Sequence, residues 1–213
     1  MEQNKLNINT IRIHSKHESA TINEEKEGQI WLEFLRGSDE ALGEIYHGYA
    51  NKLFNYGRQF TKDESLVLDV IQDVFFELIK SRNKLSVAES IKYYLFASFR
   101  RKLLREIKRN KKVIFKANFY LEDSFGIQLN PHHIHQENLF TADQKHLIEN
   151  YCNKLPPNQR EAIVLYYLHE LSYKEVSKVM HLPKVKSARS MIYRALKRLN
   201  QILSPIKDKI LIF

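Results

Sequence analysis

The sequence predicts an all-α protein made of two small helical domains joined by a flexible linker. Apolar side chains recur every three or four residues through residues 28–112 and again through 142–213, which is the period of amphipathic helices. Only six Gly and five Pro occur in the 213 residues, too few for the many tight turns of an all-β fold. In residues 113–141 the helical period fades and Asn, His, Gln and Pro become common, so this stretch is expected to link the two domains.

Four helices are expected in the first domain, after a polar tail at residues 1–27. The first helix begins near Gln29 and stops at the break formed by Gly37 and Ser38. Ser38 is expected to cap the next helix, because two acids follow it in the first turn, where the helix dipole favours negative charge. That helix and the two after it are predicted at about residues 38–54, 63–80 and 90–112.

Amino-acid composition indicates what kind of molecule the protein binds and in which cellular compartment it acts. The net charge of +9, from 34 Lys and Arg against 25 Asp and Glu, favours a polyanionic partner, although a merely soluble basic surface would give the same total. A single cysteine, Cys152, excludes an intrachain disulfide. The longest strongly apolar run, residues 162–168, is far shorter than the roughly 20 residues that span a bilayer. We therefore expect a cytoplasmic protein with no direct membrane insertion.

The sequence carries no motif for catalysis. It has no phosphate-binding loop, dinucleotide fingerprint, nucleophile elbow or pair of catalytic carboxylates. His132, His133 and His135 crowd the linker, and three imidazoles can bind a transition metal, but no carboxylate spacing supports such a site. We expect no enzymatic activity, no cofactor and no metal.

The second domain is predicted to contain a helix-turn-helix. One helix follows Pro157, a residue suited to the first helical turn. The next starts at a capping box, in which the Ser172 hydroxyl and the Glu175 carboxylate satisfy backbone amides reciprocally. A short turn at residues 181–183 then leads to a third helix at about residues 184–199. A short helix, a tight turn and a longer helix form the DNA-binding unit of many regulators.

The third of these helices has an apolar back and a basic front. Its inward residues are expected to be Val185, Ala188, Ile192, Leu196 and Leu199. No acid occurs from Lys184 to Arg198, whereas an ordinary solvated face normally mixes signs to form i,i+4 pairs. We therefore expect the front to enter the major groove of DNA. The expected contacts are Lys184, Lys186, Ser187, Arg189, Ser190, Tyr193, Arg194 and Lys197.

The helix at residues 90–112 gives a second, independent nucleic-acid signal. From Arg100 to Lys112 it contains eight basic residues and one acid, Glu106. Aromatic residues directly before them suit a melted strand, because bases stack on rings while cations follow the phosphates. The alternative is that these aromatics belong to the core. The expected contacts are Tyr93, Tyr94, Arg100, Arg101, Lys102, Arg105, Lys108 and Arg109.

The helix before it, at residues 63–80, carries acid instead. Asp69, Asp73 and Glu77 lie at i, i+4 and i+8, and Gln72 lies beside them. Residues at this spacing share one face of a helix. Taken alone, such a row is typical of a solvated surface.

Two sets of motifs resemble the extracytoplasmic-function (ECF) group of bacterial RNA polymerase sigma factors. The set similar to the second conserved sigma region lies at residues 31–42, 69–75 and 94–104. The set similar to the fourth conserved region lies at residues 155–161, 171–176 and 193–199. The resemblance covers residues 28–112 and 143–202, in the order of the family, and leaves no room for the additional domains of larger sigma factors.

The resemblance implies a sigma region 2 helical bundle and a sigma region 4 helix-turn-helix that together bind core RNA polymerase and promoter DNA. Region 2 would melt and read the minus-ten element, and region 4 would read the minus-thirty-five element. The resemblance also implies contact with the flap region of polymerase and an anti-sigma factor as a further partner. The residues implied to dock on the clamp helices of the largest polymerase subunit are Asp69, Gln72 and Asp73. Those implied to capture a flipped base are Arg82, Asn83 and Lys84.

Two departures from the family pattern bear on these roles. Arg101 and Arg105 stand where many members have Asn and Asp, so they suit phosphates rather than the usual base contacts. Ser177 stands where Ala is usual. The alternative function is a helix-turn-helix regulator that does not associate with polymerase, which would bind duplex DNA tightly by itself. An enzyme acting on nucleic acid is a remote third class.

Overall fold

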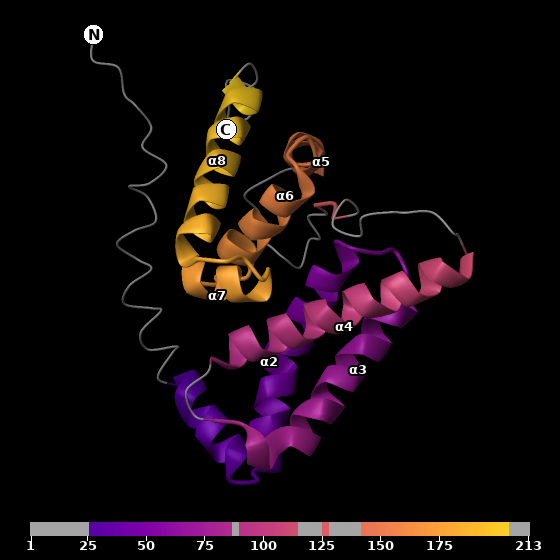
Figure 1. The fold of residues 1–213 in the computed structure, drawn as a ribbon, viewed down its shortest axis with the longest axis vertical. Helices are drawn as coiled ribbons and strands as arrows, with labels where there is room; N and C mark the ends of the chain where they lie inside the picture. The colour runs from indigo at the N-terminus through magenta and orange to yellow at the C-terminus, as the bar shows by residue number, and fades with distance from the viewer. Residues whose placement is uncertain (1–25, 87–89, 115–124, 128–141, 205–213) are drawn as a thin grey trace.

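The computed structural model describes residues 26–86, 90–114, 125–127 and 142–204, and every regular element within these ranges is a helix. Figure 1 shows α2, α3 and α4 as one group, with α5 to α8 as a second group on one side of α4, which α7 contacts. The predicted all-α class is therefore confirmed. None of the described helices is long and apolar enough to cross a membrane. The linker histidines and most of the predicted tail lie outside the described residues.

The first group of helices begins where the sequence places its caps. Its elements are α2 (Asp39–Arg58), α3 (Glu64–Ser81), the short η1 (Arg82–Lys84) and α4 (Ile91–Ile114). Helical residues 26–35 precede them. The Ser38 hydroxyl accepts a hydrogen bond from the amide of Ala41 at 3.1 Å, which confirms the predicted cap of α2. The Asp63 carboxylate caps α3 in the same way, from the amide of Leu66 at 3.0 Å.

Gly57 allows α2 to approach both of its partner helices. The core between α2, α3 and α4 contains several of the largest fully buried side chains of the chain, among them Trp31, Phe34 and Phe99. A Cβ added at Gly57 would lie 2.7 Å from Cγ1 of Val67 and 2.8 Å from Cζ of Phe99. Because real Cβ atoms do not approach this closely, a side chain at this position would push α2 away from α3 and α4.

The second group contains the predicted helix-turn-helix. Its elements are α5 (Ala142–Cys152), α6 (Pro157–Ile163), the π-helical η4 (Val164–Leu168), α7 (Tyr173–Val179) and α8 (Val185–Leu203). The capping box of α7 is present: the Ser172 hydroxyl accepts from the amide of Glu175 at 3.2 Å, and the Glu175 carboxylate accepts from the amide of Ser172 at 2.8 Å. The turn uses His181 in the left-handed region, with φ of 53°. This conformation reverses the chain within a few residues, so that α8 packs across α6 and α7.

A short part of the predicted linker is packed rather than loose. The Phe125 ring lies 4.8 Å from the Phe60 ring and is buried, as is Ile127. The Gly126 amide donates to the carbonyl of Gln59 at 2.8 Å, so the segment is bonded to the end of α2. The apolar residues of this stretch follow no regular helical or strand period, which is why the sequence does not reveal this contact. The rest of residues 113–141 beyond the end of α4 lies outside the described residues.

Replacing Gly57 with alanine is expected to destabilise the protein by about 1–3 kcal/mol, because the added methyl group overpacks the core. Gly48 is the matched control: it lies in the same helix, and a Cβ added there meets nothing within 4 Å. At such an open helical position the same change should stabilise by about 0.5–1 kcal/mol. Thermal unfolding followed by circular dichroism should move the two variants in opposite directions. Equal stability of Gly57→Ala and Gly48→Ala would contradict the close approach.

Candidate nucleic-acid and polymerase interfaces

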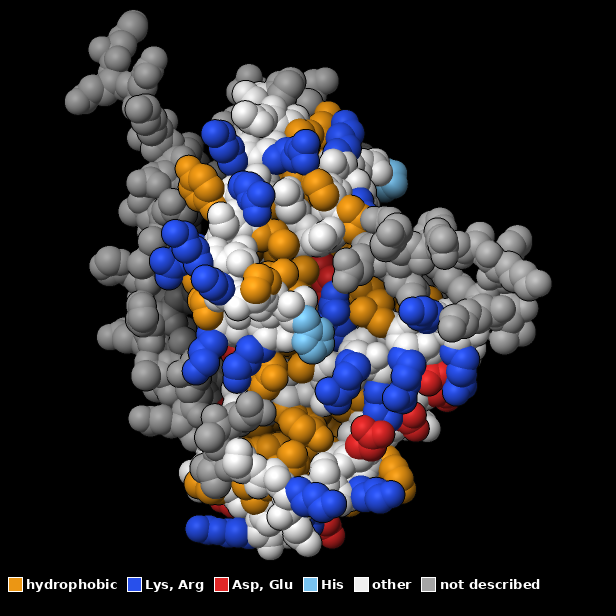
Figure 2. All heavy atoms as spheres, viewed as in Figure 1, with side chains coloured by type: hydrophobic (Ala, Val, Ile, Leu, Met, Phe, Trp, Pro, Cys, Tyr) orange, Lys and Arg blue, Asp and Glu red, His pale blue; other side chains and the backbone are white. Residues whose placement is uncertain are grey.

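The basic front of α8 is exposed along its length. Ala188, Ile192 and Ala195 form its buried back. Of the eight predicted DNA contacts, seven are exposed and Ser187 is half-buried. Figure 2 shows Lys and Arg side chains gathered over this part of the molecule. The arrangement is that of a recognition helix whose front is available to the major groove.

Val185 does not face inward as predicted but is exposed. It is the first residue of α8, and Lys184 before it is extended, with φ of −149°. A helical period assigns residues to one side of a helix but does not say how far the partner helices extend along it. Val185 thus lies at the edge of the basic front.

The predicted cations of α4 point in three directions. Arg101, Arg105, Lys108 and Arg109 are exposed. Two of them also contact the single acid of this stretch: Arg105 Nε lies 3.6 Å from the Glu106 carboxylate, and Arg109 Nη2 lies 2.8 Å from it. These exposed cations form a row on the solvent side of the helix, where they can follow a phosphate backbone.

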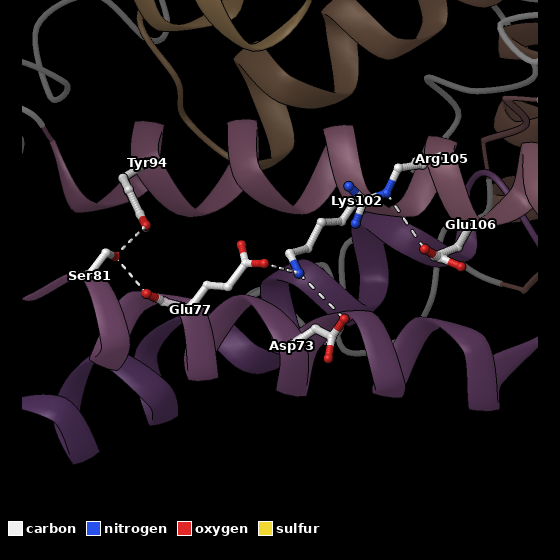
Figure 3. Close-up of polar contacts among 7 residues, drawn as sticks. All are labelled: Asp73, Glu77, Ser81, Tyr94, Lys102, Arg105 and Glu106. Atoms are coloured by element: carbon white, nitrogen blue, oxygen red, sulfur yellow. Dashed lines mark hydrogen bonds and ion pairs between the residues drawn. The ribbon is translucent and has the colours of Figure 1, made fainter.

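Lys102 points toward α3, although it was predicted to contact DNA. Its Nζ lies 2.7 Å from a Glu77 carboxylate oxygen and 3.4 Å from one of Asp73, and its side chain is buried (Figure 3). The two carboxylates remain more than half exposed. Lys102 therefore ties α4 to α3 in this conformation, and its contact with DNA stays a prediction.

Arg100 points to the opposite side of α4, into the contact with α6. Its Nε lies 2.6 Å from one Glu161 carboxylate oxygen, and its Nη2 lies 3.1 Å from the other. The Tyr56 hydroxyl donates to the same carboxylate at 2.6 Å. Burial, and then the charge of Glu161, raises the pKa of Tyr56 well above its usual value, so the hydroxyl keeps the proton that it donates. No local pattern in the sequence indicates this cluster, because its members lie 44 to 105 positions apart.

Tyr93 and Tyr94 are both half-buried. Tyr94 is held on the α3 side, with its ring 6.0 Å from that of Trp31 and its hydroxyl 3.4 Å from that of Ser81 (Figure 3). Tyr93 instead meets α7, where Lys178 Nζ lies 4.4 Å from the ring centroid. Both rings thus combine a packing role with partial access to solvent.

The acidic face of α3 is exposed and also carries exposed apolar side chains. Asp69, Gln72 and Asp73 are all exposed, as predicted for a docking surface. Phe76 and Leu68 are 67% and 49% exposed. The sequence could have indicated these two residues, because Leu68 and Phe76 lie at i and i+8, outside the row of apolar residues that faces the core. Ile79, two residues before the end of α3, is also exposed.

The predicted flipped-base loop is the short η1 turn. Arg82 stacks on the Phe34 ring, with its guanidinium carbon 4.6 Å from the centroid, and lies 3.9 Å from Asp39. Asn83 and Lys84 are exposed. The loop therefore presents two polar side chains to solvent beside an anchored arginine. Within the described part of the chain, no cluster of three or more His, Cys, Asp or Glu residues could hold a metal ion.

Family models match both groups of helices. The model of sigma-70 region 2 matches residues 45–113, and the model of sigma-70 region 4 matches residues 145–199. Together they cover more than half of the chain, and they overlie the helices that carry the acidic, basic and helix-turn-helix features described above. The chain therefore belongs to the sigma-70 family of RNA polymerase sigma factors.

Within that family the chain is an ECF-type sigma factor. It is 28% identical over 163 residues to the ECF RNA polymerase sigma factor SigM of Bacillus subtilis (strain 168), covering 76% of this chain and 94% of SigM. These matches favour a polymerase-associated sigma factor over a helix-turn-helix regulator that acts without polymerase.

Two solved structures share the fold. CnrH, solved in complex with the cytosolic domain of CnrY, matches with a TM-score of 0.57 at 20% identity, over 85% of this chain and 99% of the other. RpoE, solved with the anti-sigma factor NepR from Bartonella quintana, matches with a TM-score of 0.53 at 18% identity, over 74% of this chain and 92% of the other.

The Lys102–Glu77 contact is expected to contribute a coupling energy of only about 0.5–1 kcal/mol, because the carboxylate is largely in water. A double-mutant cycle with Lys102→Met and Glu77→Gln, read by urea unfolding, measures it. The coupling should shrink in 1 M salt, where the screening length falls to about 3 Å. A coupling energy above this range that does not change with salt would mean that the pair is shielded from water more completely than its exposure indicates.

Proposed function

We propose that this chain is a promoter-specificity subunit that docks on core RNA polymerase through α3 and contacts two promoter elements through α4 and α8. The observation that carries the proposal is the presence, in one chain, of an exposed acidic and apolar face on α3 and exposed basic rows on α4 and α8. The proposed region boundaries are residues 28–112 and 142–213, joined by residues 113–141. The subunit would supply recognition and melting, with no catalysis of its own.

The proposed polymerase surface consists of Asp69, Gln72, Asp73, Leu68 and Phe76 on α3. Exposed apolar side chains rimmed by charge are typical of protein–protein interfaces. Phe76 supplies an aromatic anchor, and the carboxylates supply charge complementarity to a basic partner. The clamp helices of the largest polymerase subunit are the proposed partner, and region 4 would meet the flap region.

The proposed promoter contacts divide between base reading and phosphate binding. On α8, Arg189 and Arg194 are exposed and long enough to make the bidentate contacts that arginine forms with guanine in the major groove. On α4, the exposed Arg101, Arg105 and Lys108 suit the phosphates of the strand melted at the minus-ten element. Asn83 and Lys84 in η1 are the exposed groups that would hold a flipped base.

We also propose an anti-sigma factor as a partner. The solved structures of CnrH and RpoE, which share this fold, hold each sigma factor with the cytosolic domain of CnrY or with the anti-sigma factor NepR. A protein of this kind would keep the chain from polymerase until a signal releases it. The proposed site of action is the cytoplasm, where polymerase and promoter DNA meet, with no insertion into the membrane.

Replacing Asp69 with arginine is expected to weaken binding to core polymerase by about thirty-fold or more, because losing a charge pair in an interface costs about 2–5 kcal/mol. Glu44→Arg makes the same charge change at an exposed position of α2 and is the control. Affinity can be measured by titrating labelled protein with core polymerase, after both variants are shown to unfold at the wild-type temperature. Normal binding by Asp69→Arg would count against the α3 surface.

Replacing Arg189 with alanine is expected to cost about 1–3 kcal/mol at one base pair of the upstream element and to relax the preference there. Transcription by holoenzyme from a randomised promoter library reports both effects, because the loss falls on particular sequences.

Lys108→Ala on α4 should instead weaken all promoters about equally, as loss of a phosphate contact does. The wild-type chain could instead bind duplex DNA tightly by itself and fail to direct transcription by core polymerase. That result would favour a helix-turn-helix regulator that does not associate with polymerase.

A further inference from the structure

The second group of helices covers part of the strand-binding face proposed for α4. Figure 1 shows α7 directly against α4, and α6 reaches α4 through the pair formed by Glu161 and Arg100. At the centre of this contact, Glu161 of α6 is only 3% exposed and holds Arg100 by two hydrogen bonds and Tyr56 by a third. Both charged groups are thus removed from water and are paired with each other.

Two further contacts lie along the same face of α4. Lys178 of α7 sits over the ring of Tyr93, with Nζ 4.4 Å from its centroid. The hydroxyl of Ser90, just before α4, donates to the carboxylate of Glu175 at 2.7 Å. Tyr93 and Arg100 are both residues predicted to contact a melted strand, one by stacking and one through a phosphate. Each is occupied here by a side chain of the second group.

The chemistry of these contacts imitates nucleic acid. A carboxylate presents two oxygens to the guanidinium fork in the way that a phosphate does. The front of α8, in contrast, is exposed in the same conformation. We propose, resting on the function proposed above, that the free chain adopts a closed state in which Glu161 occupies the phosphate site of Arg100, so that the strand contacts of Arg100 and Tyr93 are blocked while the outer cations of α4 and the front of α8 stay accessible.

The buried pair makes the closed state all-or-none. An arginine removed from water needs a partner for its charge, so Arg100 cannot leave Glu161 gradually, and separation must expose it to water or to a phosphate. A ligand opens such a state only by binding the open form more tightly than the closed one. A melted strand satisfies this condition because it supplies phosphates to Arg100 and a base to Tyr93, which the closed state excludes.

The test uses the full chain carrying Glu161→Gln, which keeps the shape of the side chain but removes its charge. The probe is a labelled single-stranded DNA of about 20 nucleotides of mixed sequence, because phosphate contacts need no particular sequence. If the closed state holds about nine-tenths or more of the molecules, opening should raise the apparent affinity about ten-fold. The dependence of log affinity on log salt should steepen by about 0.7 for the added phosphate contact.

The matched control is Glu44→Gln, which removes the same charge from an exposed position on α2. It should raise affinity only slightly and leave the salt dependence unchanged. Binding to a duplex probe, which reports on α8, should change little in either variant. Equal affinity of Glu161→Gln and Glu44→Gln for the single strand would overturn the proposal.

A second measurement guards against a variant that merely fails to fold. Small-angle scattering should give a larger radius of gyration for Glu161→Gln than for wild type, with circular dichroism unchanged. If the helix content of Glu161→Gln falls, a double variant with the charges exchanged, Arg100→Glu with Glu161→Arg, is measured instead. Wild-type helix content and a wild-type radius of gyration in this variant would support an ion pair that holds the two groups of helices together. A larger radius of gyration in the double variant, or an unchanged radius in a folded Glu161→Gln, would contradict the closed state.

The two proposals can fail separately. If wild-type chain binds core polymerase and directs transcription but Glu161→Gln shows no gain in strand binding, only the closed state is wrong. If Glu161→Gln opens and gains strand binding but neither protein binds core polymerase, the closed state stands and the sigma function is wrong.

Discussion

The rest of this structure depends on α4, which must bury apolar residues while carrying the main cationic row of the first domain. Leu95, Phe99 and Leu103 pack into the core with α2 and α3, and this fixes the rotation of the helix. Once the rotation is fixed, every other side chain has an assigned direction, because successive residues step by about 100° around a helix. Lys102 must then face α3 and Arg100 must face α6, while Arg101, Arg105, Lys108 and Arg109 stay in water.

Electrostatics serves three separate purposes around that helix. Between α3 and α4, a buried ammonium meets carboxylates that remain in water, a contact of modest energy that adjusts the position of two packed helices. Between α4 and α6, both charges are buried, and they are paired with each other while Tyr56 donates a further hydrogen bond to the carboxylate. On the outer row, the cations are exposed, two of them beside Glu106, and they can exchange water for phosphate. Similar residues therefore contribute to packing, to closure or to binding according to their solvation.

The two groups of helices also differ in how they present their functional faces. The front of α8 is displayed by a capped α7, a left-handed turn at His181 and a small-residue back formed by Ala188 and Ala195. Nothing in the described structure covers it. The face of α4 is divided between solvent and α7, and the acidic face of α3 lies on the other side, where Phe76 and Leu68 are exposed. A polymerase bound at α3 would leave the contact between α4 and α7 to be opened by DNA.

Local sequence determined the helices, their caps and the residue types on their faces, because capping boxes, apolar periods and charge rows are interactions over three or four positions. The all-α class, the cap at Ser38 and the basic front of α8 follow from such signals and are present in the structure. Only the tertiary structure decided which cations reach solvent. The burial of Arg100 by Glu161, the pairing of Lys102 and the packing of Phe125 each join residues far apart in the chain, and no local pattern encodes which distant partner a charge or ring will meet.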